Sequence, residues 1–124
     1  MIVLLDTSTA ICRLRLVDGE NSEDFQWEAG RTLARGLLEY LQTKVGNFEK
    51  VSAIGIMRGP GSFTGLRIGM AVANTLADSL NVPIVGEVGD VWQQRALKRL
   101  SSGENDQVIL PLYGSDAHIT APKK

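Results

Sequence analysis

The alternation of apolar and polar residues near the amino terminus predicts three consecutive strands. Residues 2–5 are an unbroken apolar run, and residues 11–17 alternate between apolar and polar side chains. After an Asp18-Gly19 turn, Phe25 and Trp27 stand two positions apart. A period of two is typical of half-buried strands, and a short turn between two of them favours antiparallel pairing. We therefore expect an antiparallel meander before the first helix.

Apolar residues at helical spacing predict a first helix over residues 32–45, and Gly46 stands where a helix commonly ends. The members of this apolar stripe are Leu33, Ala34, Leu37, Leu38 and Leu41. Residues 51–57 then form a nearly continuous apolar run, which is typical of a strand buried on both faces of a largely parallel sheet.

Three further elements complete the pattern. We expect a helix over residues 64–80, a short apolar strand over residues 82–86, and a third helix, capped by Asp90, with apolar residues between 91 and 100. The order β-β-β-α-β-α-β-α indicates an α/β fold with a mixed sheet. By fold analogy, this is the order of the ribonuclease-H-like domain, which also forms each half of actin-like ATPases.

Residues 58–69 join the predicted buried strand to the second helix through a glycine-rich run. Gly59-Pro60-Gly61 permits a tight turn, and Ser62 or Thr64 can cap the helix by accepting a hydrogen bond from a backbone N–H. Such a junction also presents amides and the positive end of a helix dipole to an anion, which Arg58 could help to hold. The lysine of a P-loop is absent from the run.

Small residues recur every four positions along the predicted second helix, at Gly65, Gly69, Ala73 and Ala77. Glycine inside a helix costs roughly 1 kcal/mol relative to alanine, so close packing must compensate that cost. Two interpretations of this small-residue strip remain open. It packs on the sheet or first helix of the same chain, or it meets another protein.

Composition and charge restrict the class of protein. The chain has 124 residues, 44% of them hydrophobic, and a formal net charge of −1. We expect one globular domain and no charge-driven binding of nucleic acid across its surface. The single cysteine, Cys12, favours a buried thiol in a reducing compartment. No apolar run approaches the ~18 residues of a membrane span, and no signal segment follows Met1, so a cytoplasmic location is expected.

The turn after the first strand is a candidate phosphate site, because actin-like ATPases hold a phosphate there beside a metal-binding aspartate. The candidate nucleotide or anion residues are Asp6, Thr7, Ser8, Thr9, Arg58 and Gly59. The alternative interpretation is a turn whose side chains bond the local backbone. A complete nucleotide site in that fold also needs loops from a second half, which favours the turn.

Metal and nucleophile chemistry find little support in the sequence. His118 is the single histidine, there is no HExxH pair, and catalytic zinc usually needs three protein ligands. Ser8 and Ser62 have no general base that the sequence places beside them. We therefore predict no metal site and no catalytic residue.

Residues 1–9 and 58–69 closely resemble the bacterial TsaB family, also called YeaZ, and the resemblance extends over roughly residues 1–100. It implies a non-catalytic partner that activates a TsaD-type subunit in threonylcarbamoyl transfer to adenosine of tRNA. It also implies a TsaE-type ATPase as a further partner, tRNA contact only through the complex, and a homodimer when the protein is alone. The chain by itself would need no cofactor, whereas ATP or ADP with Mg²⁺ could lie at a site shared with the partner.

The TsaB family uses the second helix and its neighbour to form a helical bundle with TsaD or with a second copy. The resemblance therefore favours an external role for the small-residue strip. The implied partner-binding residues are Leu33, Leu37, Gly61, Phe63, Thr64, Gly65, Leu66, Arg67, Gly69, Met70, Ala73 and Ala77.

The resemblance also divides the chain. Residues 1–105 correspond to a TsaB-like ribonuclease-H-like domain, and residues 106–124 form a short extension where the family carries a second α/β domain. Two alternatives to the partner role remain. One is a small phosphotransferase or ATPase that uses Asp6 and Thr9, which nucleotide turnover by the pure chain would reveal. The other is a domain fragment without function, which failure to bind any TsaD would reveal.

Overall fold

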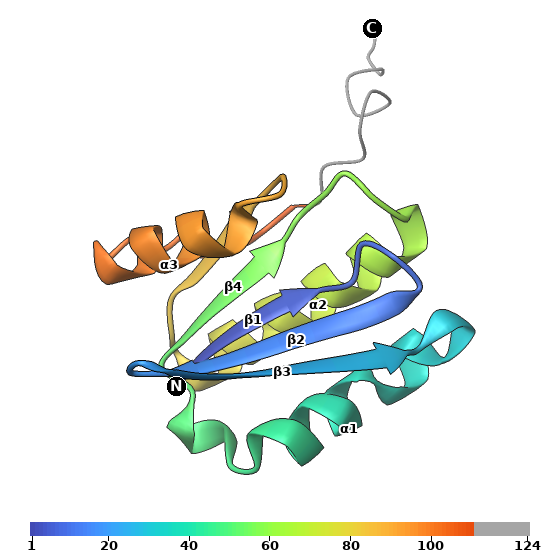
Figure 1. Cartoon of the computed structure of the whole chain (residues 1–124), viewed down its shortest axis with the longest axis horizontal. Helices are drawn as coiled ribbons and strands as arrows, with labels where there is room; N and C mark the ends of the chain where they lie inside the picture. The colour runs from blue at the N-terminus through green and yellow to red at the C-terminus, as the bar shows by residue number, and fades with distance from the viewer. Residues whose placement is uncertain (111–124) are drawn as a thin grey trace, which may run out of the picture.

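A five-stranded sheet with helices on both faces forms the centre of the protein (Figure 1). The computed structural model describes residues 1–110. The strands are β1 (Ile2–Asp6), β2 (Ile11–Asp18), β3 (Asn21–Glu28), β4 (Ala53–Met57) and β5 (Ile84–Glu87). The helices are α1 (Leu33–Val45), α2 (Phe63–Leu80) and α3 (Trp92–Ser101), with short 3-10 turns at Gly30–Thr32 and Phe48–Lys50. None of the helices within residues 1–110 has the length and apolar character needed to cross a membrane.

The strand order of the sheet is β3-β2-β1-β4-β5. β1 pairs antiparallel with β2, and β2 with β3, which confirms the predicted meander. β1 also pairs parallel with β4, and β4 with β5. Parallel neighbours need a crossover connection, which α1 and α2 supply. The mixed sheet and the element order confirm the ribonuclease-H-like fold, the half-unit of actin-like ATPases.

The sheet separates a layer of two helices from a layer of one helix. α1 and α2 pack on one face around the larger core, where Leu5, Leu37 and Ile56 are almost fully buried. α3 lies on the opposite face and covers Leu4 and Val85 (Figure 1). α2 therefore has one side against the sheet and another side that faces away from it.

Helix α1 buries a narrower stripe than the sequence predicts. Its buried residues are Leu33, Leu37, Leu41 and Val45. The prediction that Ala34 and Leu38 widen this stripe is wrong, because both residues are exposed. Gly46 ends the helix with φ +87°, as predicted, since glycine adopts a positive φ without steric cost.

The helix starts agree with one predicted cap and contradict the other. Ser62 Oγ accepts a hydrogen bond from the N–H of Gly65 at 3.2 Å, which confirms Ser62 as the cap of α2. The predicted cap of α3 is wrong. Val91 takes the cap position there, and no side chain at that position accepts a bond from the helix, so Asp90 lies one residue outside.

Residues 104–110, here called the closing segment, pack against the rest of the domain. Ile109 is only 3% exposed, and its backbone N–H and carbonyl bond the amide of Asn74 at 2.8 Å and 2.9 Å. The predicted boundary after residue 105 is therefore wrong for residues 106–110, which belong to the same packed unit. The rest of the predicted extension, including His118, lies outside the described residues.

Candidate functional site

The small-residue strip of α2 lies inside the protein. Gly65 and Gly69 face Thr7, which is fully buried at the end of β1. A Cβ atom on Gly69 would overlap the Thr7 hydroxyl oxygen, and one on Gly65 would overlap the Thr7 carbonyl oxygen. Ala73 and Ala77 are buried in the larger core. The strip therefore serves packing within the chain.

Eight predicted partner-binding residues are consequently wrong as surface contacts, because they are buried within the chain. They are Leu33, Leu37, Gly65, Leu66, Gly69, Met70, Ala73 and Ala77. The other four are exposed, and for them partner binding stays a prediction. They are Gly61, Phe63, Thr64 and Arg67.

Hydrogen bonds join the loop after β1 to the start of α2. Thr7 Oγ1 donates to the carbonyl of Gly65 at 2.8 Å, and the N–H of Ser62 donates to the carbonyl of Ser8 at 2.8 Å. Gly61 lies so near Ser8 that a Cβ at this glycine would be 2.6 Å from the Ser8 Cβ. The glycines let the two backbones approach closely, and this contact fixes the direction in which α2 leaves the junction.

The candidate phosphate turn bonds mainly to itself. Asp6 Oδ1 accepts hydrogen bonds from the N–H of Ser8 at 2.8 Å and from its hydroxyl at 2.6 Å. Thr9 Oγ1 accepts from the N–H of Ile11 at 3.2 Å. These are contacts of a local turn, and a nucleotide or anion there stays a prediction. Within residues 1–110, no three His, Cys, Asp or Glu side chains are grouped to hold a metal ion.

α1 and α2 together form an exposed surface on the side of the helices that faces away from the sheet. Two hollows of about 430 Å³ and 310 Å³ are both lined by Ala71. We call this the outer helical surface and define it by Leu38, Phe63, Arg67, Ala71, Val72 and Thr75. Leu38 is 50% exposed and Phe63 is 55% exposed. The surface therefore offers apolar contact area to another molecule.

The outer helical surface follows from the same spacing as the buried strip. Arg67, Ala71 and Thr75 recur every four positions, as the strip does, but two residues out of step with it. Two positions along a helix are about half a turn, so the two rows lie on different sides. Two residues of this surface, Phe63 and Arg67, are predicted from the sequence as partner contacts, and the other four are missed. The signal that could have found the surface was Leu38, a leucine outside the 33-37-41 stripe of α1.

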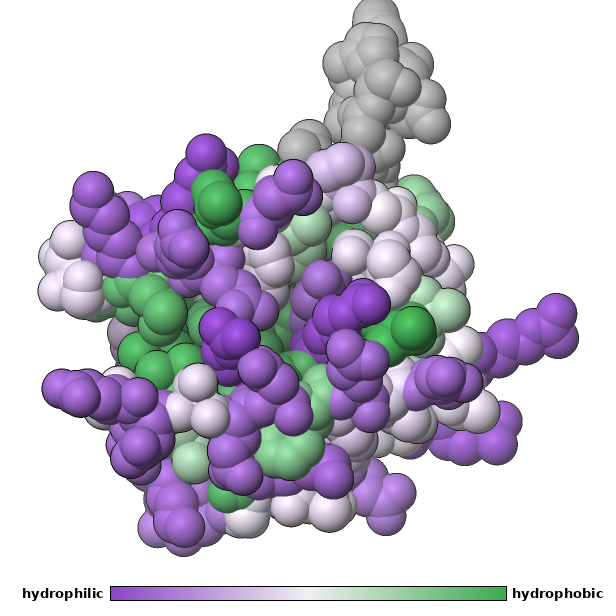
Figure 2. All heavy atoms as spheres, viewed as in Figure 1, coloured by the Kyte–Doolittle hydropathy of each residue, from purple (hydrophilic) through white to green (hydrophobic). Residues whose placement is uncertain are grey.

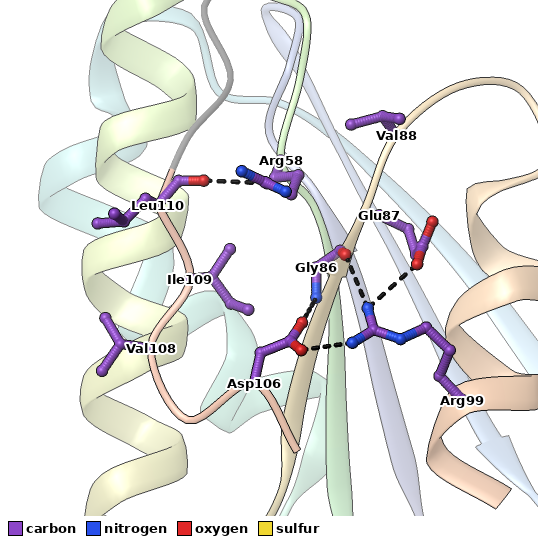
Figure 3. A pocket seen from close by; sticks show the side chains of 9 residues that line it. All are labelled: Arg58, Gly86, Glu87, Val88, Arg99, Asp106, Val108, Ile109 and Leu110. Atoms are coloured by element: carbon purple, nitrogen blue, oxygen red, sulfur yellow. Dashed lines mark hydrogen bonds and ion pairs between the residues drawn. The ribbon is translucent and has the colours of Figure 1, made fainter. Parts of the chain in front are cut away.

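A polar cavity of about 350 Å³ lies at the ends of β4 and β5 (Figure 3). Arg99 of α3 lines this cavity, and its guanidinium forms ion pairs with three carboxylates. These are Glu87 at 3.1 Å, Glu104 at 2.7 Å, and Asp106. Arg58, a predicted anion residue, donates its Nε–H to the carbonyl of Leu110 at 3.0 Å. Through these ion pairs and hydrogen bonds, the closing segment is held against β4, β5 and α3.

We expect Cys12 to resist alkylation in the folded protein. Burial, with a smaller contribution from the Asp6 carboxylate, raises the pKa of the Cys12 thiol to about 11, so its reactive thiolate is scarce near neutral pH. Intact mass measured after iodoacetamide treatment should show an unmodified native protein and a labelled protein in urea. Equal labelling rates in the two conditions would contradict the burial of this thiol.

Comparisons with known proteins point to one biosynthetic family. Residues 31–88 match the family profile described as TsaD, tRNA N6-adenosine threonylcarbamoyltransferase. The tRNA threonylcarbamoyladenosine biosynthesis protein TsaB of Haemophilus influenzae is 32% identical over 108 residues, which are 84% of this chain and 46% of that protein. The TsaB of Escherichia coli is 33% identical over 89 residues, which are 68% of this chain and 38% of that protein.

Solved structures agree with these relatives. YeaZ from Pseudomonas aeruginosa matches with a TM-score of 0.64 and 31% sequence identity, over 81% of this chain and 49% of that chain. The chain thus spans about half the length of the relatives that it matches. The TsaB and YeaZ alignments cover more of the chain than the TsaD match does. On these alignments and on the shared fold, the chain belongs to the TsaB (YeaZ) family.

Proposed function

We propose that this protein is a non-catalytic partner that binds and activates a TsaD-type subunit during threonylcarbamoyl transfer to adenosine of tRNA. Its TsaB relatives are named for threonylcarbamoyladenosine biosynthesis on tRNA. The match of residues 31–88 to the TsaD family supports a domain similar to part of that subunit. Two similar domains can pair through equivalent helices, which is a common way to build a dimer.

The outer helical surface carries the proposal. Half-exposed Leu38 and Phe63 stand beside hollows on neighbouring helices. Contiguous apolar patches on a surface commonly mark sites of protein–protein contact. Ala71 and Thr75 are small and exposed on α2, so a helix of the partner can approach closely there. We therefore assign TsaD binding to the outer helical surface.

Self-association is proposed for the same surface. The chain alone would form a homodimer through α1 and α2, and a TsaD-type subunit would compete with the second copy. A TsaE-type ATPase would join the complex, and tRNA would be held through the other subunits, since the net charge of −1 gives this chain no general attraction for nucleic acid.

No chemical step is proposed for the chain itself. One oxygen of the Asp6 carboxylate, Oδ1, accepts two hydrogen bonds from Ser8, which supports a local turn in place of a phosphate site. ATP or ADP with Mg²⁺ is proposed only at a site shared with the TsaD-type partner, where Thr9 and Gly59 could contribute from this side.

Ala71→Arg is expected to weaken binding of the TsaD from the same source by roughly thirtyfold or more. The new side chain would fill the hollow and bring an unpaired charge into an apolar contact, a loss typical of a hot-spot position. Affinity should be measured by titration calorimetry of the purified proteins. Gln94→Arg places the same charge at an exposed position of α3, on the other face of the sheet, and should bind like wild type. Unchanged affinity of Ala71→Arg would reject the surface.

A further inference from the structure

The edge of the sheet at β5 is closed by hydrogen bonds. The N–H of Ile84 donates to Asn105 Oδ1 at 3.1 Å, and its carbonyl accepts from the N–H of Asp106 at 2.8 Å. The N–H of Gly86 donates to Asp106 Oδ2 at 3.0 Å, and its carbonyl accepts from Arg99 Nη1 at 3.1 Å. Both residues thus have all their outward backbone groups bonded, so a further strand has nothing to pair with here.

The opposite edge, at β3, is open. The two-residue turn after β2 joins Asp18 to Asn21, and the residues that flank such a turn exchange backbone hydrogen bonds. Alternation then directs the backbone groups of residues 22, 24, 26 and 28 away from β2. β3 is an edge strand of the sheet. No backbone group from residues 1–110 forms a hydrogen bond with the outward groups of residues 22, 24, 26 and 28.

β3 lacks several of the devices that usually protect such an edge. The strand has eight residues and pairs with β2 in continuous register, without a bulge. It contains neither proline nor lysine. Natural sheets commonly block long edges with proline, charged side chains, bulges or a covering segment, and of these β3 has, within residues 1–110, charged side chains alone, all of them acidic. The contrast with β5, which has a covering segment, marks β3 as the edge at which a strand can be added.

The open edge is acidic. Between residues 16 and 30 there are five acidic residues and no lysine or arginine, namely Asp18, Glu20, Glu23, Asp24 and Glu28. Asp24 pairs with Arg15 at 2.6 Å, and none of the other four forms an ion pair within residues 1–110. Hydrophilic side chains predominate in the lower part of Figure 2, where Figure 1 shows β3 and α1.

This charge restricts what can pair with β3. Two copies of the strand side by side would bring carboxylates opposite one another, which destabilises a strand pair. Nucleic acid would be repelled by the same carboxylates. The Asp24 carboxylate is already paired with Arg15, but Glu23 and Glu28 form no ion pair within residues 1–110 and point to opposite faces of the strand. A strand that carries lysine or arginine would therefore find an opposite charge on each face of the edge.

We propose that the β3 edge binds an extended, lysine- or arginine-rich peptide segment of another protein by strand addition. The backbone of the segment pairs with the outward groups of residues 22, 24, 26 and 28, and its basic side chains lie beside Glu23 and Glu28. Main-chain hydrogen bonds provide affinity in this mode of recognition, and the side chains provide selectivity.

The test is a titration of the full ¹⁵N-labelled chain with a short peptide of alternating lysine and threonine, with a glutamate–threonine peptide as the comparison. The basic peptide should shift the backbone amide signals of residues 22–28 and slow hydrogen exchange at residues 22, 24, 26 and 28. The acidic peptide should leave these signals unchanged. Absence of binding by the basic peptide, equal binding of both peptides, or protection outside β3 would overturn the proposal.

Variants separate the backbone and charge contributions. Gln26→Pro removes an outward N–H and leaves the ladder with β2 intact, so binding should weaken by about tenfold or more. Glu23→Lys combined with Glu28→Lys should have a similar effect without a change in the backbone. Asp78→Lys, an exposed reversal near the end of α2, is the control and should bind like wild type. Undiminished binding by the Glu23/Glu28 variant would overturn the proposal.

Discussion

Replacing Gly69 with leucine is expected to destabilise the isolated domain by about 3 kcal/mol or more, at the upper end of the cost of overpacking a core. The first added atom, Cβ, already overlaps the Thr7 hydroxyl oxygen, and Thr7 is fully buried and bonded to Gly65. If the strip faced a partner instead, leucine would raise helix propensity and stabilise the monomer by something under ~1 kcal/mol. Urea unfolding, measured at a protein concentration that keeps wild type monomeric, shows whether leucine lowers or raises the free energy of unfolding.

A double-mutant cycle locates the clash. Gly69→Ala adds only the Cβ atom. Thr7→Ala removes the Thr7 hydroxyl oxygen and the Thr7 methyl group, both of which lie near this Cβ. The double variant should therefore be more stable than the sum of the two single changes predicts, by about 1 kcal/mol or more. Additive effects would show that Gly69 and Thr7 do not share this contact.

Replacing Arg99 with methionine is expected to cost about 2 kcal/mol of folding free energy. It leaves three carboxylates and the Gly86 carbonyl without their shared donor, while methionine keeps much of the aliphatic stem. The loss should fall below the roughly 3–5 kcal/mol of a broken buried pair, because the Arg99 side chain is 23% exposed. Arg95→Met is the matched control on the same helix. Within residues 1–110 the Arg95 side chain forms one hydrogen bond, to the carbonyl of Val88 at 3.4 Å. This bond is weak, so less than about 0.5 kcal/mol of folding free energy should be lost.

At acidic pH, the difference in unfolding free energy between wild type and Arg99→Met should become much smaller. Burial raises the pKa of Asp106, but hydrogen bonds from Arg99 and from the N–H of Gly86 outweigh it and hold the pKa below the ordinary 3.8. A carboxyl group with a lower pKa in the folded state stabilises that state above its unfolded pKa, and this stabilisation disappears as pH falls through the folded value. Urea unfolding should show the full difference near neutral pH and a smaller one below about pH 4. A constant difference would exclude Asp106 as an important partner of Arg99.

Local periodicity in the sequence was enough to predict most elements of the fold. The period-two alternation across Cys12, Leu14 and Leu16 marks the side of β2 that is buried, and the structure buries all three. The leucines at positions 33, 37 and 41 likewise mark the buried side of α1. The positions of Gly46 and Ser62 indicated one helix end and one helix start. These signals are local, because each depends on residues a few positions apart.

The buried side of α2 could not be decided in this way. The small residues of the strip with Gly69 suit close packing against the sheet of the same chain or against a helix of another protein, so the pattern leaves both possibilities open. The choice depends on Thr7, whose hydroxyl bonds Gly65, a residue 58 positions later in the sequence. No local pattern contains such a contact, which is why the sequence-based prediction of surface contacts along this strip is wrong.

The closing segment shows the same limit. In the sequence, residues 106–110 follow the last predicted helix without a periodic pattern, so the sequence predicts an extension there. In the fold, Ile109 enters the core beside Asn74, and Asp106 bonds both Arg99 and the edge of β5. The sequence by itself determined which segments could be strands and helices, since that depends on neighbouring residues. The tertiary structure alone decided which surfaces remain for partners, because burial depends on residues that only folding brings together.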